Sequence, residues 1–229
     1  MIIQSMSVMG VSTKGNAEQA ELCRLIMDRD HHIIIGVGAA GTGKNFISIA
    51  TALQLVLDKK YSRIYYTRNA SEVGRSLGYL KGDMDKKFGP YTAPLQDTLE
   101  SIQRASELKL NLDNMWRNIQ TIPTGYIRGR NLDDCIFICD ECQNLSLTEL
   151  QTLITRMGEH SKIVLLGSFN QVDETAQLRK EKCDFQTAAE ALMGLDYVGF
   201  VKLEKSMRSP WCAEIDELFE NLKKAEKQQ

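Results

Sequence analysis

The chain has 229 residues, of which 43% are hydrophobic and 25% charged, close to the average for soluble globular chains. This length suits a single domain over residues 1–229, with a core that needs neither a disulfide framework nor a structural metal. The net charge of −2 disfavours binding of nucleic acid by bulk charge but leaves room for a local basic patch. Because we find neither a secretory signal nor an apolar run approaching the roughly 18 residues of a membrane span, we expect a cytoplasmic protein without a membrane partner.

Short apolar runs rich in β-branched residues alternate along the chain with longer amphipathic stretches. We expect strands at residues 32–37, 63–67, 135–139, 162–166 and 197–203. We expect helices at residues 17–30, 44–58, 91–104, 147–157, 187–192 and 211–224. Strands of about five residues that alternate with helices indicate right-handed βαβ units, and therefore an α/β fold with a parallel sheet flanked by helices.

Two regions depart from this alternation. About fifty residues, 74–124, separate the second and third expected strands. A connection of this length is too long for a simple loop, so we expect a helical insertion there. The charged residues 223–229 are expected to fray.

The first expected strand runs directly into a glycine-rich loop, after which a helical pattern begins. The loop reads Gly38, Ala39, Ala40, Gly41, Thr42, Gly43, Lys44. This is the G-x-x-x-x-G-K phosphate-binding pattern in the strand, loop and helix context that it requires. Its glycines allow backbone N–H groups to surround a polyphosphate, the helix N-terminus adds positive charge, and Lys44 reaches the β and γ phosphates of ATP. A chance glycine-rich turn is the alternative interpretation.

Asn45 departs from the usual pattern, because this position normally carries a serine or threonine whose hydroxyl binds Mg²⁺. An amide oxygen is a suitable ligand for a hard cation, but it reaches further and at a different angle. We therefore expect ATP binding to survive this replacement, and the rate of hydrolysis stays open.

The third expected strand ends in Asp140 and Glu141, the Walker B pattern. Asp140 is expected to hold Mg²⁺, and Glu141 to orient and deprotonate the attacking water. An acidic helix start after a buried strand would look the same, but the upstream phosphate loop favours the catalytic interpretation. Cys139 and Cys142 have C-x-x-C spacing; we interpret them as ordinary buried cysteines, since a zinc site would twist the carboxylates away.

Two later polar residues are candidates for sensing the terminal phosphate. Gln171 follows the fourth expected strand, at the edge where α/β sheets bind ligands, although a polar turn is the alternative. Arg208 lies before the last expected helix, where an arginine could stabilise charge on a transferred phosphoryl group. Taken alone, Arg208 is better interpreted as a solvated surface residue.

Six ordered blocks of sequence, covering about residues 19–217, together resemble the PhoH family of P-loop ATPases, relatives of the motor core of superfamily 1 helicases. The blocks lie at residues 38–45, 67–69, 74–95, 126–130, 140–144 and 167–173. Three positions depart from the family pattern: Ala39 replaces a proline, Asn45 a threonine and Ser168 an aspartate. The resemblance implies a RecA-like sheet, ATP-dependent activity and ring-shaped hexamers.

The resemblance also implies roles for individual residues. Gln19 matches the glutamine that reads adenine, and Gln143 and Gln171 match residues that couple the γ phosphate to strand movement. Arg208 matches a γ-phosphate arginine. We weigh Arg68 and the pair Arg128 and Arg130 evenly between contacts to nucleic acid or a neighbouring subunit and structural salt bridges. These arginine residues lie in the blocks at 67–69 and 126–130.

Two functions from different classes follow from these observations. A superfamily 1 helicase encloses its nucleotide between two RecA-like cores, and this chain has room for one. We therefore expect a homo-oligomeric ring, a hexamer, with ATP and Mg²⁺ at its subunit interfaces and hydrolysis coupled to single-stranded nucleic acid, RNA rather than DNA. The alternative is a nucleotide-binding scaffold or regulator with weak or no hydrolysis, which Asn45 and Ser168 slightly favour. Either would work in the cytoplasm of a bacterial or phage-infected cell.

Overall fold

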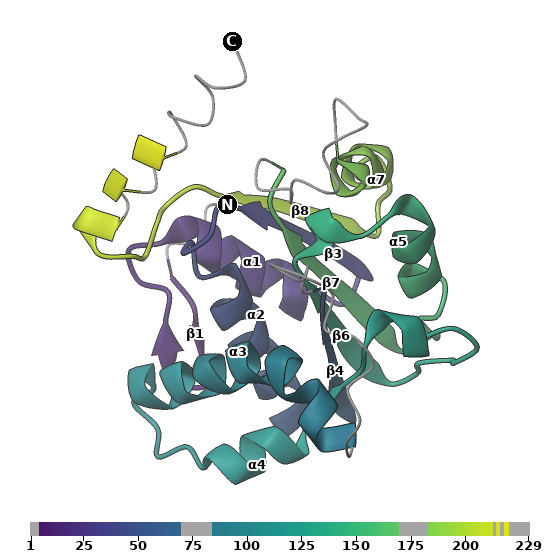
Figure 1. Cartoon of the computed structure of the whole chain (residues 1–229). Coiled ribbons are helices and arrows are strands. Elements are labelled where there is room, and N and C mark those ends of the chain that lie inside the picture. Colours follow the sequence, from purple (N-terminus) through teal and green to yellow (C-terminus); the bar gives the residue numbers. More distant parts are fainter. Residues whose placement is uncertain (1–4, 70–83, 170–182, 213, 216–217, 220–229) are drawn as a thin grey trace.

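The computed structural model describes residues 5–69, 84–169, 183–212, 214–215 and 218–219 (Figure 1). Its main sheet has six strands in the order β5-β4-β6-β7-β3-β8, and every neighbouring pair is parallel. The strands are β3 (Ile33–Gly38), β4 (Arg63–Arg68), β5 (Ile119–Thr121), β6 (Cys135–Asp140), β7 (Ser161–Gly167) and β8 (Val198–Leu203). The helices are α1 (Ala17–Met27), α2 (Lys44–Leu57), α3 (Met84–Ala105), α4 (Leu112–Arg117), α5 (Leu147–Ile154) and α7 (Asp184–Leu192), with 3-10 turns η1 (Thr124–Tyr126) and η2 (Cys142–Asn144). The expected α/β fold, a RecA-like parallel sheet flanked by helices, is confirmed.

Alternate residues of each strand face opposite sides of the sheet, as the two-residue period of a strand requires. Ile34 and Val164 belong to an apolar cluster that also holds buried side chains of α1, α2 and α3. Ile35 and Leu165 belong to a second cluster, which holds buried side chains of α5 and α7. Helices cover both faces of the sheet (Figure 1), so β3, β6 and β7 are buried along their whole length.

The ends of α1 and the start of α2 follow from local chemistry. α1 begins after Asn16, whose side chain accepts a hydrogen bond from the backbone N–H of Gln19 at 3.0 Å. It ends at Met27, three residues before the expected end, because Asp28 adopts an extended conformation with φ −67° and ψ 132°. α2 begins immediately after Gly43, which has a left-handed conformation.

Each of the five expected strands is present, with ends within one residue of the prediction. The insertion is helical, as expected: α3 corresponds to the helix predicted at residues 91–104 but begins earlier, at Met84, and α4 was not predicted individually. The insertion also contains β5, which pairs with β4 and extends the sheet by one strand. A strand of three residues is too short to leave a periodic signal, so β5 could not be predicted.

A short antiparallel ribbon near the N-terminus was not predicted either. It consists of β1 (Ser7–Val8) and β2 (Val11–Ser12), joined by Met9 and Gly10. Both turn residues have positive φ, 53° and 73°, as a two-residue hairpin turn requires. Ser106 donates to the carbonyl of Met9, so the ribbon contacts the residue that follows α3.

Some predictions fall outside the described residues. They concern the start of the insertion, Gln171 and the fraying of residues 223–229. The described residues between 210 and 219 are helical, as expected for the last helix. Within the part of the chain that the structure describes, no helix is long and apolar enough to cross a membrane.

Candidate active site

The loop of residues 38–44 joins β3 to α2 at the carboxyl edge of the sheet. Gly38 lies beside β8, where an added Cβ would be 2.5 Å from the carbonyl oxygen of Leu203. Gly43 has a φ of 77°, which disfavours any residue with a side chain. Both positions therefore require glycine, and the loop ends at the N–H groups of the first turn of α2, where an anion is stabilised.

Hydrogen bonds from three directions hold the shape of this loop. Within it, Thr42 Oγ1 donates to the carbonyl of Ala39 at 3.0 Å. From α1, the buried Gln19 donates through Nε2 to the carbonyl of Thr42, also at 3.0 Å. From the segment after β8, the backbone N–H of Met207 donates to the carbonyl of Gly41 at 2.8 Å. Gln19 therefore braces the loop, and its contact with adenine stays a prediction.

Lys44 Nζ folds back over the loop and donates to the carbonyl of Ala39 at 3.2 Å. Burial lowers the pKa of Lys44 below its usual value. The carboxylates of Asp140 and Glu141 act on this pKa in the opposite direction, whereas the guanidinium group of Arg208 lowers it further. The charges of the acidic pair therefore act on the loop lysine.

Asp140 ends β6 with a side chain that is only 6% exposed. One carboxylate oxygen accepts a hydrogen bond from the hydroxyl of Tyr66 at 3.3 Å, and the other accepts from the backbone N–H of Glu141 at 3.0 Å. Burial raises the pKa of Asp140, the charge of Glu141 adds to this, and Arg68 and Lys44 oppose it. Two donors and two nearby cations therefore favour the charged form against the cost of burial.

Glu141 has a left-handed backbone, with φ 58° and ψ 42°, which is unusual for a residue with a side chain. Both oxygens of its carboxylate are engaged. Arg68 Nη2 lies 3.1 Å from Oε1, and Gln143 Nε2 donates to Oε2 at 2.5 Å. The amide oxygen of Gln143 in turn accepts from the backbone N–H of Ser168 at 3.0 Å. Gln143 therefore links the expected catalytic base to the end of β7, and Arg68 forms a structural ion pair with it.

The polar groups around Asn45 fit a hard cation. Asn45 Nδ2 donates to the hydroxyl of Tyr66 at 3.4 Å, while Asn45 Oδ1 is buried without a hydrogen-bond partner. A buried acceptor without a partner is costly, and a bound cation would satisfy it. Among the described residues, no group of three or more His, Cys, Asp or Glu side chains could hold a metal. An amide oxygen and the Asp140 carboxylate instead match Mg²⁺, which keeps waters and binds substrate phosphates.

Arg208 lies against the loop although it is far from it in the sequence. A Cβ added at Gly41 would be 2.6 Å from both Cγ and Nε of Arg208. The side chain is otherwise exposed, and its charge reaches Lys44. The position of Arg208 is that of a residue able to contact a bound phosphate, whereas Gln171, the other expected sensor, lies outside the described residues.

The two cysteines beside the acidic pair are buried. Cys142 Sγ donates to the carbonyl of Cys139 at 3.2 Å, and burial raises the pKa of the Cys142 thiol well above its usual value. Cys139 belongs to the cluster on the α5 and α7 side of the sheet, whereas the hydroxyl that reaches Asp140 comes from Tyr66 in the other cluster. These thiols therefore pack in the interior beside the site.

Comparison with known proteins agrees with this geometry. The family model described as "PhoH-like protein" matches residues 11–220. A "PhoH-like protein" of Bacillus subtilis (strain 168) is 33% identical over 82% of this chain and 58% of its own length. "Protein PhoH2" of the same organism is 33% identical over 91% of the chain and 48% of its own length, and "Protein PhoH" of Escherichia coli (strain K12) is 31% identical over 85% and 54%.

The chain thus spans about half the length of the curated relatives it matches. Among solved structures, a crystal structure of T4 UvsW aligns with 82% of this chain and 35% of its own at 10% identity, with a TM-score of 0.26 that carries no argument. Family membership therefore rests on the family model and on the curated relatives. The fold is that of a P-loop NTPase, and the chain belongs to the PhoH family.

Proposed function

We propose that the chain binds ATP together with Mg²⁺ and hydrolyses it at the site formed by the loop and the end of β6. One observation carries this proposal: Lys44 lies within electrostatic range of both Asp140 and Glu141 at the carboxyl edge of the sheet. A loop that surrounds phosphate, a lysine and an acidic pair are the parts that phosphoryl transfer requires.

Each residue has a distinct role in this proposal. The N–H groups at the start of α2 and the ammonium of Lys44 bind the phosphates, and Lys44 exchanges its bond to Ala39 for them. Mg²⁺, held by Asn45 Oδ1 and Asp140, would supply neutralising charge for the phosphates. Glu141 orients and deprotonates the attacking water, and Arg208 stabilises charge on the transferred group.

The resting arrangement favours regulated rather than continuous hydrolysis. Both oxygens of Glu141 accept a hydrogen bond, from Arg68 and from Gln143, so an attacking water has to share the carboxylate with these two donors. This engagement also favours the second candidate function, a nucleotide-binding scaffold or regulator with weak or no hydrolysis. Withdrawal of Arg68 by a neighbouring subunit or by nucleic acid would couple hydrolysis to assembly or to binding.

We further propose a ring of identical subunits, a hexamer, with single-stranded RNA rather than DNA as its nucleic-acid partner. The exposure of Arg208 beside the loop supports an interface there, since one core leaves the nucleotide open on one side. Arg128 and Arg130 are exposed on the loop after η1, and they support a confined basic surface on a chain of net charge −2. The matched relatives are bacterial, which supports the proposal that this protein acts in the cytoplasm of a bacterial or phage-infected cell.

Phosphate release from ATP tests the catalytic proposal, measured alone and with single-stranded RNA or DNA at several Mg²⁺ concentrations. Loss of the general base in Glu141→Gln should lower turnover by about 10²–10⁴-fold and leave the affinity for ATP nearly unchanged. Equal turnover in the wild type and this variant would contradict the role of Glu141. ATP binding without turnover under every condition would favour the scaffold, and sedimentation as a monomer with and without ATP would contradict the ring.

A further inference from the structure

Tyr66 lies on β4, outside both motifs of the site, and yet it touches both. Its side chain is 1% exposed and belongs to the cluster on the α2 face of the sheet. Its hydroxyl lies 3.4 Å from Nδ2 of Asn45 and 3.3 Å from Oδ2 of Asp140. One phenol therefore connects the first turn of α2 to the end of β6.

The hydrogen bonds of the Tyr66 hydroxyl can be arranged in one way only. An ionised carboxylate only accepts hydrogen bonds, so the single proton of the Tyr66 hydroxyl is donated to Asp140. The hydroxyl oxygen can then only accept, and the partner within reach is the NH₂ group of Asn45.

This direction decides which end of the Asn45 amide is left over. With NH₂ committed to Tyr66, the oxygen Oδ1 is the end without a partner, and it is buried. A serine or threonine hydroxyl is both donor and acceptor and needs no such choice. The oxygen of an amide binds cations, whereas its NH₂ group repels them. An asparagine at this position therefore requires a neighbour that binds the NH₂ group and leaves the oxygen for the cation.

We infer that Tyr66 is a positioning residue that orients the Asn45 amide so that Oδ1 faces the Mg²⁺ of a bound nucleotide, and that holds the Asp140 carboxylate beside it. This inference rests on the proposed function, because it assigns the device by which that site accepts asparagine in place of serine or threonine. Tyr66 acts through Asn45 and Asp140 and does not itself touch the metal.

The test is the Mg²⁺ dependence of nucleotide affinity, which needs no turnover. The dissociation constant of a fluorescent, non-hydrolysable ATP analogue is measured in excess Mg²⁺ and in EDTA, and the ratio of the two constants gives the contribution of the metal. Tyr66→Phe keeps the ring and removes the hydroxyl. We expect this ratio to fall by about tenfold, as when a residue that orients a metal ligand is removed, with the constant in EDTA changed by less than about twofold.

Tyr65→Phe is the matched control, since it makes the same change one residue away on the same strand. Tyr65 is half-buried and packs on the other face of the sheet, against Phe137. Tyr65→Phe should leave the ratio of the two dissociation constants unchanged. In the Asn45→Thr background, Tyr66→Phe should lower the ratio less than it does in the wild type, because a threonine hydroxyl has no amide to orient and only the contact with Asp140 is lost.

The outcomes separate this inference from the proposed function. A wild type whose affinity is the same in Mg²⁺ and in EDTA overturns both the metal site and the role of Tyr66. A wild-type ratio that Tyr66→Phe leaves intact overturns the inference alone. A variant that weakens binding equally in Mg²⁺ and in EDTA also overturns it, since the hydroxyl would then support the fold and not the metal.

Discussion

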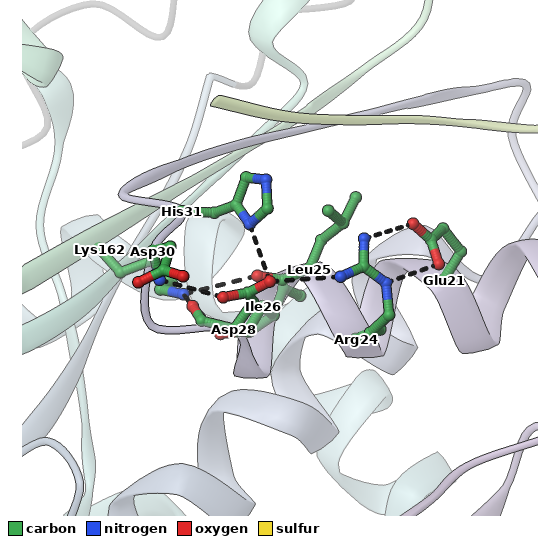
Figure 2. A network of polar contacts seen from close by, with 8 residues as sticks. All are labelled: Glu21, Arg24, Leu25, Ile26, Asp28, Asp30, His31 and Lys162. Carbon is green, nitrogen blue, oxygen red and sulfur yellow. Dashed lines mark hydrogen bonds and ion pairs between the residues drawn. The ribbon is translucent and has the colours of Figure 1, made fainter. Parts of the chain in front are cut away.

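Two lysines with lowered pKa values lie at opposite ends of the sheet, and they have different partners; Lys162 is buried and Lys44 is half-buried. Lys162, near the start of β7, donates through Nζ to the carbonyl oxygens of Leu25 at 3.5 Å, Ile26 at 2.8 Å and Asp28 (Figure 2). Lys44, at the carboxyl end, donates to the single carbonyl of Ala39. Burial lowers the pKa of both, and that of Lys162 falls to about 8.

The difference between them teaches how to recognise a ligand-binding lysine. An ammonium group has three protons, and Lys162 directs them at the last carbonyls of α1, which have no partner within the helix and carry its negative dipole end. Among the described residues Lys44 makes one such bond, which leaves two protons for phosphate oxygens. A lowered pKa is common to both, so the number of partners, and not burial, distinguishes a binding lysine from a structural one.

The surroundings of the two lysines differ in the same way. Around the end of α1, Arg24 pairs with Glu21 at 2.7 Å and with Asp28 at 3.2 Å, and His31 lies 3.2 Å from Asp28 (Figure 2). Arg24, Glu21 and Asp28 therefore pair with one another, and His31 Nδ1 lies beside the Asp28 carboxylate, although it makes no hydrogen bond among the described residues. Near Lys44, the buried Oδ1 of Asn45 has no hydrogen-bond partner among the described residues.

The largest expected effect comes from Lys44→Met, which keeps the apolar stem and removes the charge. We expect ATP affinity to fall by about 100-fold, because charged hydrogen bonds to phosphate are lost, with little change in the free energy of unfolding. Equilibrium binding and urea unfolding measure the two quantities. Unchanged affinity would remove Lys44 from the site.

Lys162→Met makes the same chemical change at the other end of the sheet. It should lower the free energy of unfolding and leave the affinity for ATP unchanged, the reverse of what we expect for Lys44→Met. Three buried carbonyls lose their donor, so we expect a loss of about 2–3 kcal/mol in the free energy of unfolding. The affinity of the remaining folded protein for ATP should be unchanged. Urea unfolding and equilibrium binding check this prediction, and a variant as stable as the wild type would contradict the structural role of Lys162.

The smallest expected effect is a pH dependence. The pKa of Lys162 is about 8 when folded, against 10.5 when unfolded, so between these values the unfolded chain binds more protons. The free energy of unfolding contributed by Lys162 therefore rises with pH across this window and is constant below it. Subtracting the free energy of unfolding of Lys162→Met from that of the wild type removes the contributions of the other titratable groups. This difference should grow by ~2 kcal/mol from about pH 8 to about pH 10. A flat difference would contradict the lowered pKa.

The sequence predicted those parts that depend on local patterns. Buried parallel strands are continuous apolar runs, so their ends were located within one residue. The phosphate loop was recognised because its glycines and Lys44 follow one another at fixed spacing between a strand and a helix, and the positive φ of Gly43 is a local requirement of this turn. That the loop and the acidic pair belong to one site was inferred from the two motifs occurring together in the chain, and the charges of Asp140 and Glu141 do act on Lys44.

What could not be predicted depends on contacts between distant residues. Tyr66 lies on β4 between residues that alternate in burial and is itself expected in the core, and nothing nearby in sequence reveals that its hydroxyl reaches Asn45 and Asp140. The early end of α1 depends on Lys162, more than a hundred positions away, which takes up the carbonyls of its last turn. The engagement of Glu141 by Arg68 likewise joins two strands that are far apart in the chain.

The bond from Met207 to Gly41 has a practical consequence for fluorescence experiments. It fixes the chain to the phosphate loop five residues before Cys212, a half-buried free thiol. Of the other five cysteines, four are buried and the fifth, Cys183, caps the start of α7 with its sulfur. Serine caps helices well, so Cys183→Ser leaves a chain with one reactive thiol, and a dye attached to it would sit at the rim of the loop and report nucleotide binding in real time.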